Sequence, residues 1–290
     1  MKIAIAQLNP TIGDLIGNAQ QILNAAQSAA QQGANLMITP ELALCGYPPR
    51  DLLMQPAFVD AMADRLAKLA QELPPGVTVL VGTVERNERS PQTGEKALFN
   101  SCALLAKGKI QQYFRKRLLP TYDVFDEDRY FASATSSNSF LLHHQDMSLR
   151  IGVTICEDIW NDEGFWGKRS YAADPIADLV EQDVDLTVNL SASPYSMGKQ
   201  KLREAMLQHA AVRYQQPILY ANQVGGNDDL VFDGNSVGFN RKGVIICRGK
   251  AFESDLILVE YDPTTEQFVP ASPQPHESSI APQPENRDAE

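Results

Sequence analysis

One cysteine in this sequence stands where many enzymes place a reactive thiol. Cys156 follows the apolar, β-branched run at 151–155 and precedes two carboxylates, Glu157 and Asp158. Such a run predicts a buried strand, and α/β folds bind their ligands at the carboxyl ends of such strands. A thiol placed there could attack an electrophilic carbon as a nucleophile. A lone cysteine is, however, more often a small buried hydrophobic residue.

A nucleophilic thiol needs a base, a positive charge that favours the thiolate, and a donor for the oxyanion. Glu157 and Asp158 would disfavour the thiolate if their side chains pointed toward it. The four histidines occur in polar or peripheral contexts. A cysteine–histidine pair is therefore the weaker hypothesis.

Two charged residues occupy positions comparable to that of Cys156. Glu41 follows the strand predicted at 36–39, and Lys116 enters a long polar loop predicted at 115–138. Long loops in compact domains are usually functional. Either residue could equally be an ordinary surface charge, so neither decides the question alone.

Alternating strands and helices are predicted around these residues. Apolar runs predict strands at 2–8, 36–39, 77–84, 99–106, 110–114, 140–143, 149–155, 186–190, 218–223, 235–239, 244–247 and 255–259. Helical spacing of apolar residues predicts helices at about 18–32, 58–73, 169–182 and 202–214. Because hairpins alternate with helices, we expect a mixed α/β sandwich with helices on the outer faces of its sheets.

The composition changes near the carboxyl terminus. Residues 262–290 are rich in proline, serine, glutamine and acidic residues. Such a segment cannot bury enough apolar surface to fold alone. The sequence therefore predicts one folded domain over 1–261 and a proline-rich linker or tail over 262–290.

Charge and composition exclude several classes of function. A net charge of −11 and a pI near 4.9 argue against nucleic acid or an anionic membrane surface as a partner. The four cysteines are far apart and lack metal-site spacing to the histidines. The amino terminus does not resemble a signal peptide, and no apolar run is long enough to cross a bilayer. We expect a soluble, reduced, cytoplasmic protein.

Three segments in order carry a family resemblance: PELALCGYP at 40–48, RKRLLP at 115–120 and ICEDIW at 155–160. Together they resemble the nitrilase (carbon–nitrogen hydrolase) superfamily, over nearly the whole chain up to the tail. The resemblance implies a four-layer α-β-β-α sandwich of the nitrilase type. It also implies an oligomer whose building block is a dimer that packs such units face to face.

Further segments are similar to a narrower group, the glutamine amidohydrolase domains of glutamine-dependent NAD synthetases. They are YPPRDLL at 47–53, YDVFDEDRYF at 122–131 and GGNDDLVFDG at 225–234. The similarity implies hydrolysis of the glutamine side-chain amide to glutamate and ammonia through a cysteine thioester. The partner that receives the ammonia would be a synthetase domain that these residues do not contain.

The resemblance also implies roles for single residues. Cys156 is the expected nucleophile, Glu41 the general base and Lys116 the cation that holds the oxyanion. Glu127 is expected to support catalysis by holding Lys116, although it could be a loop carboxylate beside Arg129.

Glutamine would be bound, by the same resemblance, through Tyr122, Glu157, Ser193 and Lys199. Position 199 is lysine where some relatives have arginine, and lysine lacks the planar fork that pairs with a carboxylate. Lys199 could instead be an ordinary residue of an exposed helix. Trp160 is either a wall of the pocket or part of the core.

No metal or cofactor is expected for the amidohydrolase reaction. ATP and magnesium would serve only the synthetase domain, whose SGGxDS-type phosphate loop does not occur in these residues. Two alternatives remain open: a stand-alone amidase, nitrilase or N-carbamoyl hydrolase, and a catalytically idle oligomerisation or ammonia-channel module.

Overall fold

The computed structural model describes residues 1–271. Two large mixed sheets form its centre. The first has the strand order β15-β14-β1-β2-β3-β4-β5. Its strands are β1 (Lys2–Gln7), β2 (Ala34–Ile38), β3 (Thr78–Arg86), β4 (Leu98–Ala106), β5 (Lys109–Arg115), β14 (Asp255–Asp262) and β15 (Gln267–Pro270).

The second sheet has the order β13-β12-β9-β8-β7-β6. Its strands are β6 (Asn138–His144), β7 (Met147–Ile155), β8 (Leu186–Ser191), β9 (Ile218–Asn222), β12 (Val237–Phe239) and β13 (Ile245–Arg248). A separate hairpin consists of β10 (Val224–Asn227) and β11 (Leu230–Asp233).

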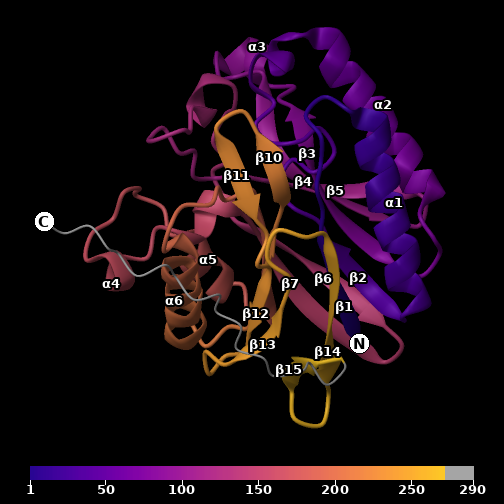
Figure 1. Cartoon of the computed structure of the whole chain (residues 1–290), viewed down its shortest axis with the longest axis vertical. Coiled ribbons are helices and arrows are strands. Elements are labelled where there is room, and N and C mark those ends of the chain that lie inside the picture. The colour runs from indigo at the N-terminus through magenta and orange to yellow at the C-terminus, as the bar shows by residue number, and fades with distance from the viewer. Residues whose placement is uncertain (272–290) are drawn as a thin grey trace, which may run out of the picture.

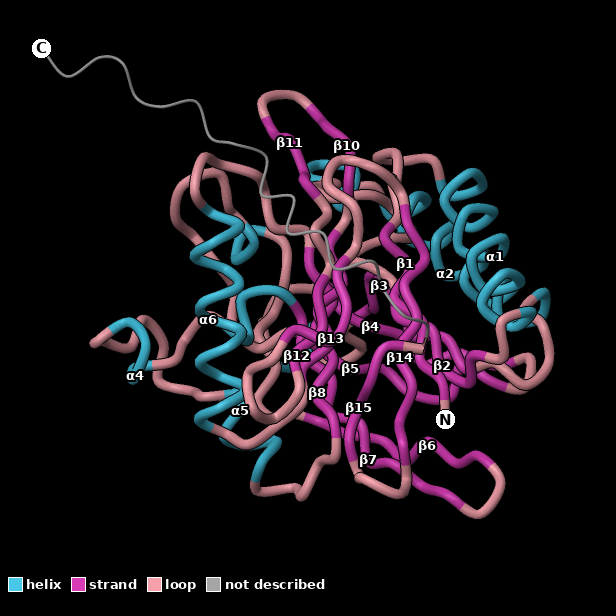
Figure 2. The backbone as a smooth tube through the Cα atoms, turned by 60° about the horizontal axis from the view of Figure 1, so that its bottom comes forward, coloured by secondary structure: helices cyan, strands magenta, loops and turns pink. Residues whose placement is uncertain are grey.

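Helices cover the outer faces of both sheets, and the sheets face each other between them (Figures 1 and 2). The first sheet carries α1 (Leu15–Gln31) and α2 (Pro56–Glu72), and the second carries α5 (Pro175–Val180) and α6 (Lys199–Arg213). The short elements are α3 (Ser90–Thr93), α4 (Glu163–Trp166), and the 3-10 helices η1 (Arg50–Met54), η2 (Glu127–Arg129) and η3 (Cys156–Ile159). The predicted four-layer α-β-β-α sandwich is confirmed.

Strand periodicity builds the layers. Along β1, Ile3 and Ile5 point into the core between the sheets, while Ala4 and Ala6 point toward α1 and α2. Successive side chains of a strand face opposite sides, so a strand buried on both faces is apolar throughout. A third cluster, under α6, packs Met206 and other apolar residues against the second sheet.

The topology gathers several strand ends at one place. The centre of each sheet is parallel, through β1-β2-β3 in the first and β7-β8-β9 in the second. Ligand sites of α/β folds lie at the carboxyl ends of such parallel strands. Glu41 lies shortly after β2, Cys156 directly after β7, and Ser193 shortly after β8.

One predicted helix is wrong in its first half. Residues 169–182 were predicted as helical, but α5 covers only Pro175–Val180. The side chain of Asn161 accepts hydrogen bonds from the N–H groups of Ser170 and Tyr171, at 2.9 and 3.1 Å, which holds that segment in a non-helical path. Asp174 then caps α5 by accepting from Ala177 N–H at 3.1 Å.

The sheet extends past the domain boundary predicted at 261. That residue lies inside β14, and β15 pairs with it in antiparallel register. Phe268 of β15 is buried in the core between the sheets. The remainder of the predicted tail, 272–290, lies outside the described residues.

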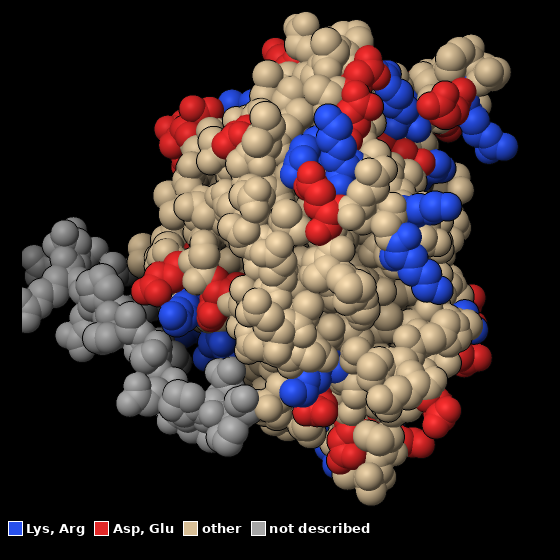
Figure 3. Space-filling model, turned by 90° about the vertical axis from the view of Figure 1, so that its right-hand side faces the viewer, with Lys and Arg blue, Asp and Glu red and all other residues tan. Residues whose placement is uncertain are grey.

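Acidic and basic side chains are interspersed on the face shown in Figure 3, without a continuous basic strip. Within residues 1–271, no helix has the length and apolar character needed to span a membrane.

Candidate active site

Cys156 lies at a sharp backbone turn. β7 ends at Ile155, and η3 begins at Cys156 itself. The φ angle of Cys156 is 42°, in the left-handed region that few non-glycine residues adopt. Strain of this kind clusters at functional sites, where the surrounding structure holds it in place. The thiol is buried and yet lines a cavity described below.

Asp158 fixes this turn. Its carboxylate accepts from the N–H of Ile155 at 3.0 Å, and from those of Arg117 and Leu118 at 3.0 and 2.9 Å. These bonds join the end of β7 to the segment that carries Lys116. Burial raises the pKa of Asp158 to about 6, against the lowering effect of the three hydrogen bonds. The Asp158 carboxylate is thus hydrogen-bonded to backbone N–H groups and does not point toward the thiol.

Glu41 lies in a segment that packs directly on β3. Thr39 N–H donates to Leu80 O at 3.0 Å, and Gly82 N–H donates to Thr39 Oγ1 at 3.1 Å. Gly82 must be glycine, because a Cβ there would lie 2.2 Å from Pro40 O. This close approach fixes the backbone on either side of Glu41, whose side chain is fully buried.

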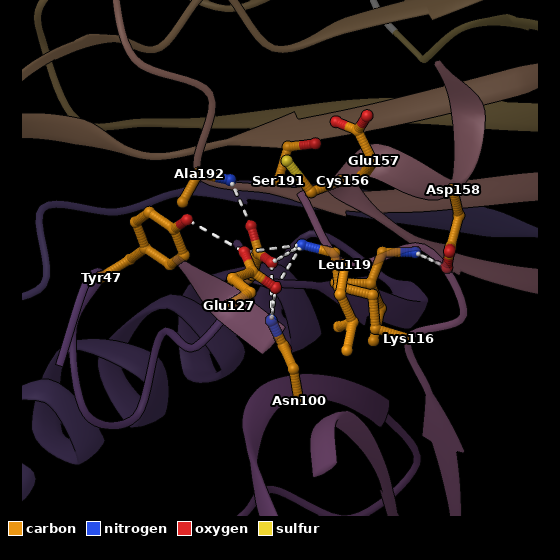
Figure 4. Close-up of polar contacts among 12 residues, drawn as sticks. Tyr47, Asn100, Lys116, Leu119, Glu127, Cys156, Glu157, Asp158, Ser191 and Ala192 are labelled. Atoms are coloured by element: carbon orange, nitrogen blue, oxygen red, sulfur yellow. Dashed lines mark hydrogen bonds and ion pairs between the residues drawn. The ribbon is translucent and has the colours of Figure 1, made fainter. Parts of the chain in front are cut away.

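Lys116 is buried between two carboxylates (Figure 4). Its Nζ donates to Glu41 Oε1 at 2.7 Å and to both carboxylate oxygens of Glu127 at 2.8 Å. The backbone of Lys116 is held by a bond to Asn100 O at 2.9 Å and by one from Ala134 N–H at 3.0 Å. Three residues predicted for the site therefore come together from three separate elements.

Three further groups complete this buried cluster and were not predicted. Asn100 Nδ2 donates to Glu41 Oε1 at 2.8 Å and to Glu127 Oε2 at 3.3 Å. Tyr47 OH donates to Glu127 Oε1 at 2.9 Å, and Ala192 N–H donates to Glu41 Oε2 at 3.1 Å. Asn100 could have been noticed as a buried amide within the apolar strand β4. The Ala192 contact is made by the backbone and leaves no sequence signal.

Burial and charge set the protonation of the cluster. Burial lowers the pKa of Lys116, but the charges of Glu127 and Glu41 outweigh it and hold that pKa well above its usual value. Burial raises the pKa of Glu127, although Lys116 opposes this. Burial, reinforced by Glu41, raises the pKa of the Cys156 thiol well above its usual value, while Lys116 lowers it. The resting state therefore contains a charged lysine and a neutral thiol.

A cavity of about 270 Å³ opens beside the thiol. Its lining includes every substrate-binding residue predicted from the sequence. The lining residues are Tyr122, Phe125, Cys156, Glu157, Trp160, Trp166, Lys168, Ser170, Ser193 and Lys199. Phe125, Trp166, Lys168 and Ser170 were not predicted. Trp160 lines the cavity, where it stacks on Trp166 with ring centroids 6.0 Å apart, and it also packs against the apolar cluster under α6.

Opposite charges line this cavity. Glu157 is buried, and its Oε2 accepts from Tyr122 OH at 2.8 Å. Burial raises the pKa of Glu157, and the Tyr122 hydrogen bond lowers it. Lys199, at the start of α6, lies with its Nζ 6.0 Å from the centroid of the Trp160 ring. A small molecule with both an ammonium and a carboxylate group matches this arrangement.

A second cavity, of about 560 Å³, contacts the far side of the charged cluster. Tyr47 and Glu127 line it, but Cys156 does not. Of these two cavities, the smaller is therefore the candidate substrate site, because it is the one that Cys156 lines.

Comparison with known proteins shows the family of this chain. The sequence profile of the carbon-nitrogen hydrolase family matches residues 2–270. A glutamine-dependent NAD(+) synthetase of Synechocystis sp. is 54% identical over 260 residues, which are 90% of this chain and 46% of the relative. One of Thermotoga maritima is 39% identical over 264 residues, 90% of this chain and 42% of the relative. This chain thus spans about half the length of these relatives.

Solved structures show the same fold. The glutamine-dependent NAD+ synthetase of Acinetobacter baumannii, solved with ADP, aligns with a TM-score of 0.82 and 33% identity, over 94% of this chain and 48% of that one. An amidase from Nesterenkonia sp. aligns with a TM-score of 0.71 and 22% identity, over 89% of each chain. At that identity the amidase supports the fold alone.

Two sheets flanked by helices, with a thiol at a strand end beside a buried lysine and two glutamates, define a nitrilase-type α/β enzyme. Because its family profile extends over nearly all the described residues, the chain belongs to the carbon-nitrogen hydrolase family.

Proposed function

We propose that this chain hydrolyses the side-chain amide of glutamine to glutamate and ammonia. The observation that carries the proposal is the cavity, which places Cys156 beside a buried carboxylate, Glu157, and a cation, Lys199. The relatives described above are glutamine-dependent NAD(+) synthetases, which supports glutamine over other small amides.

The reaction begins with proton transfer. Glu41 takes the proton of the Cys156 thiol as sulfur attacks the amide carbon, and a tetrahedral intermediate forms. Because burial favours the neutral thiol, transfer and attack are expected to occur together. Glu41 then returns the proton to the leaving nitrogen, and ammonia departs from a thioester.

The same carboxylate completes the cycle. A water molecule gives a proton to Glu41 and attacks the thioester carbon, which releases glutamate. Sulfur recovers the proton from Glu41, so Cys156 is regenerated. Glu41 thus serves twice, and no histidine is needed.

Lys116 is the proposed donor to the oxyanion. Glu127 accepts from its Nζ through both oxygens, so the lysine is held without rotamer freedom before substrate arrives. A preorganised donor of this kind costs no reorganisation during the reaction. The backbone N–H of Glu157, in the first turn of η3, is the proposed second donor.

Recognition of glutamine divides between the two charges of the cavity. Glu157 and Tyr122 would take the α-ammonium group, while Lys199 and Ser193 would take the α-carboxylate. Lysine makes this second contact as a compact charge and not as a bidentate fork, so the α-carboxylate is held less rigidly than arginine would hold it.

We further propose that the ammonia passes to a synthetase domain, and that the chain works in the cytoplasm as an oligomer built from dimers. Its cysteines within the described residues are free and buried, which suits a reducing compartment. No cofactor is proposed for the hydrolysis, and ATP with magnesium would serve only the synthetase domain.

Ammonia release from a panel of substrates tests this function. The purified chain is incubated with glutamine, other ω-amides, nitriles and N-carbamoyl amino acids. Preference for glutamine supports the proposal. Preference for another class would favour a stand-alone amidase, nitrilase or N-carbamoyl hydrolase, and no turnover of any substrate would favour an idle oligomerisation or ammonia-channel module.

A further inference from the structure

Each oxygen of the Glu157 carboxylate accepts a hydrogen bond from a tyrosine hydroxyl. Tyr122 OH donates to Oε2 at 2.8 Å, and Tyr171 OH donates to Oε1 at 3.1 Å. Two donors on opposite oxygens fix the plane of a carboxylate and favour its charged form. A carboxylate has about four lone-pair sites, so further sites remain for a ligand in the cavity.

Tyr171 is itself held by a buried amide. The side chain of Asn161, 4% exposed, donates to Tyr171 O at 2.8 Å and accepts from Tyr171 N–H at 3.1 Å. It also donates to Ala173 O at 2.7 Å and accepts from Ser170 N–H at 2.9 Å. An asparagine side chain has two N–H donors and one oxygen. The whole amide is thus engaged in shaping the backbone around Tyr171.

The segment that carries Tyr171 is anchored at both ends. At its start, Asp162 caps α4 by accepting from Gly164 N–H at 2.8 Å. At its end, Asp174 caps α5 and accepts from Tyr214 OH at 2.9 Å. A hydroxyl on so constrained a segment can hold Glu157 in one orientation before any ligand binds.

We infer that Tyr171 is a specificity-determining positioning residue, which orients Glu157 to receive the ammonium group of the substrate. The inference rests on the proposed function and deepens it. Tyr171 does not line the cavity, so it acts through Glu157 and not on the substrate. Asn161 sets the backbone position from which the Tyr171 hydroxyl reaches Oε1.

A single-atom change tests this role. Tyr171→Phe removes the hydroxyl and keeps the ring. Loss of a hydrogen bond to a charged group should raise KM for glutamine roughly 10-fold. We expect kcat to stay within about 2-fold, because the thiol, Glu41 and Lys116 are untouched. KM for glutaramate, which is glutamine without the α-amino group, should not change.

The matched control is Tyr130→Phe, which removes another tyrosine hydroxyl-to-carboxylate bond, the one to Asp51 at 2.6 Å, and neither residue lines the cavity beside the thiol. Its KM for glutamine should stay at the value of the unchanged chain. An unchanged KM in Tyr171→Phe, or an equal rise for glutamine and glutaramate, would overturn the inference while leaving the proposed function intact. Absence of glutamine turnover by the unchanged chain would overturn both.

Discussion

Lys116 carries the electrostatics of the site at the scale of single residues. It is fully buried, and its Nζ contacts the carboxylates of Glu41 and Glu127. Removing one partner of a buried charge pair strongly destabilises the folded protein, because the other charge stays buried without a partner. The lysine therefore has two roles: it neutralises the charges of Glu41 and Glu127, and it donates a hydrogen bond to the oxyanion in the proposed mechanism. Only kinetic measurements on a folded variant separate these roles.

Lys116→Met keeps an unbranched side chain, one atom shorter than that of lysine, and removes the charge. We expect kcat for glutamine to fall on the order of 10²–10³-fold, because loss of one oxyanion donor typically costs that much. Steady-state ammonia release gives kcat, and circular dichroism checks the fold. A folded variant that retains the original kcat would remove Lys116 from the mechanism.

At the scale of elements, the end of β7 depends on one side chain. Asp158 accepts from three backbone N–H groups that belong to two separate segments. Without it, these buried donors would have no acceptor, and the Cys156 turn would lose its link to the segment after β5. The position of Cys156 relative to Lys116 is therefore set by the contact between the end of β7 and the segment after β5.

Asp158→Ala tests that link. Unsatisfied buried donors typically cost ~1–3 kcal/mol, so we expect the free energy of unfolding to fall by about that range, with a loss of kcat. Urea denaturation and ammonia release are measured on the same preparation. Asp60, an exposed carboxylate on α2 that pairs with the exposed side chain of Arg86, provides the control variant Asp60→Ala, which should retain most stability.

The edge strand β15 gives a second prediction at this scale. Phe268→Ala should lower the free energy of unfolding by about 3–5 kcal/mol, as is typical for a buried aromatic residue. Val269 is the matched control, since it is 36% exposed on the same strand. Equal, small effects of Phe268→Ala and Val269→Ala in urea denaturation would show that β15 adds nothing to the fold.

Most strands and helices could be predicted from the sequence, whereas structure that depends on contacts between separate segments could not. Apolar runs located the strands that deliver Glu41 and Cys156, because burial leaves a strong periodic signal. The path of 169–174 was missed, since it depends on the side chain of Asn161 from elsewhere in the chain. Asn100 was missed because its contact with Glu41 joins distant elements, and Tyr171 because its hydrogen bond to Glu157 depends on the non-helical path of 169–174.

At the scale of the whole molecule, α6 closes the outer face of the second sheet and still exposes apolar side chains. Leu202 and Val212 are 42% and 45% exposed on this helix. A second copy packed on this layer would bury them. We therefore expect light scattering to give a particle of at least two chains of 32.0 kDa each. A monomer at all concentrations tested would contradict the expected dimer.

The proposed mechanism requires that Cys156 forms the thioester with glutamine. The most direct measurement is the rate of ammonia release from glutamine by purified Cys156→Ala, beside the unchanged chain under the same conditions. The other cysteines are buried and line neither cavity, so none can replace it, and we predict that release falls to the background rate without protein. Glutamine turnover retained by the folded Cys156→Ala variant would contradict the proposed mechanism.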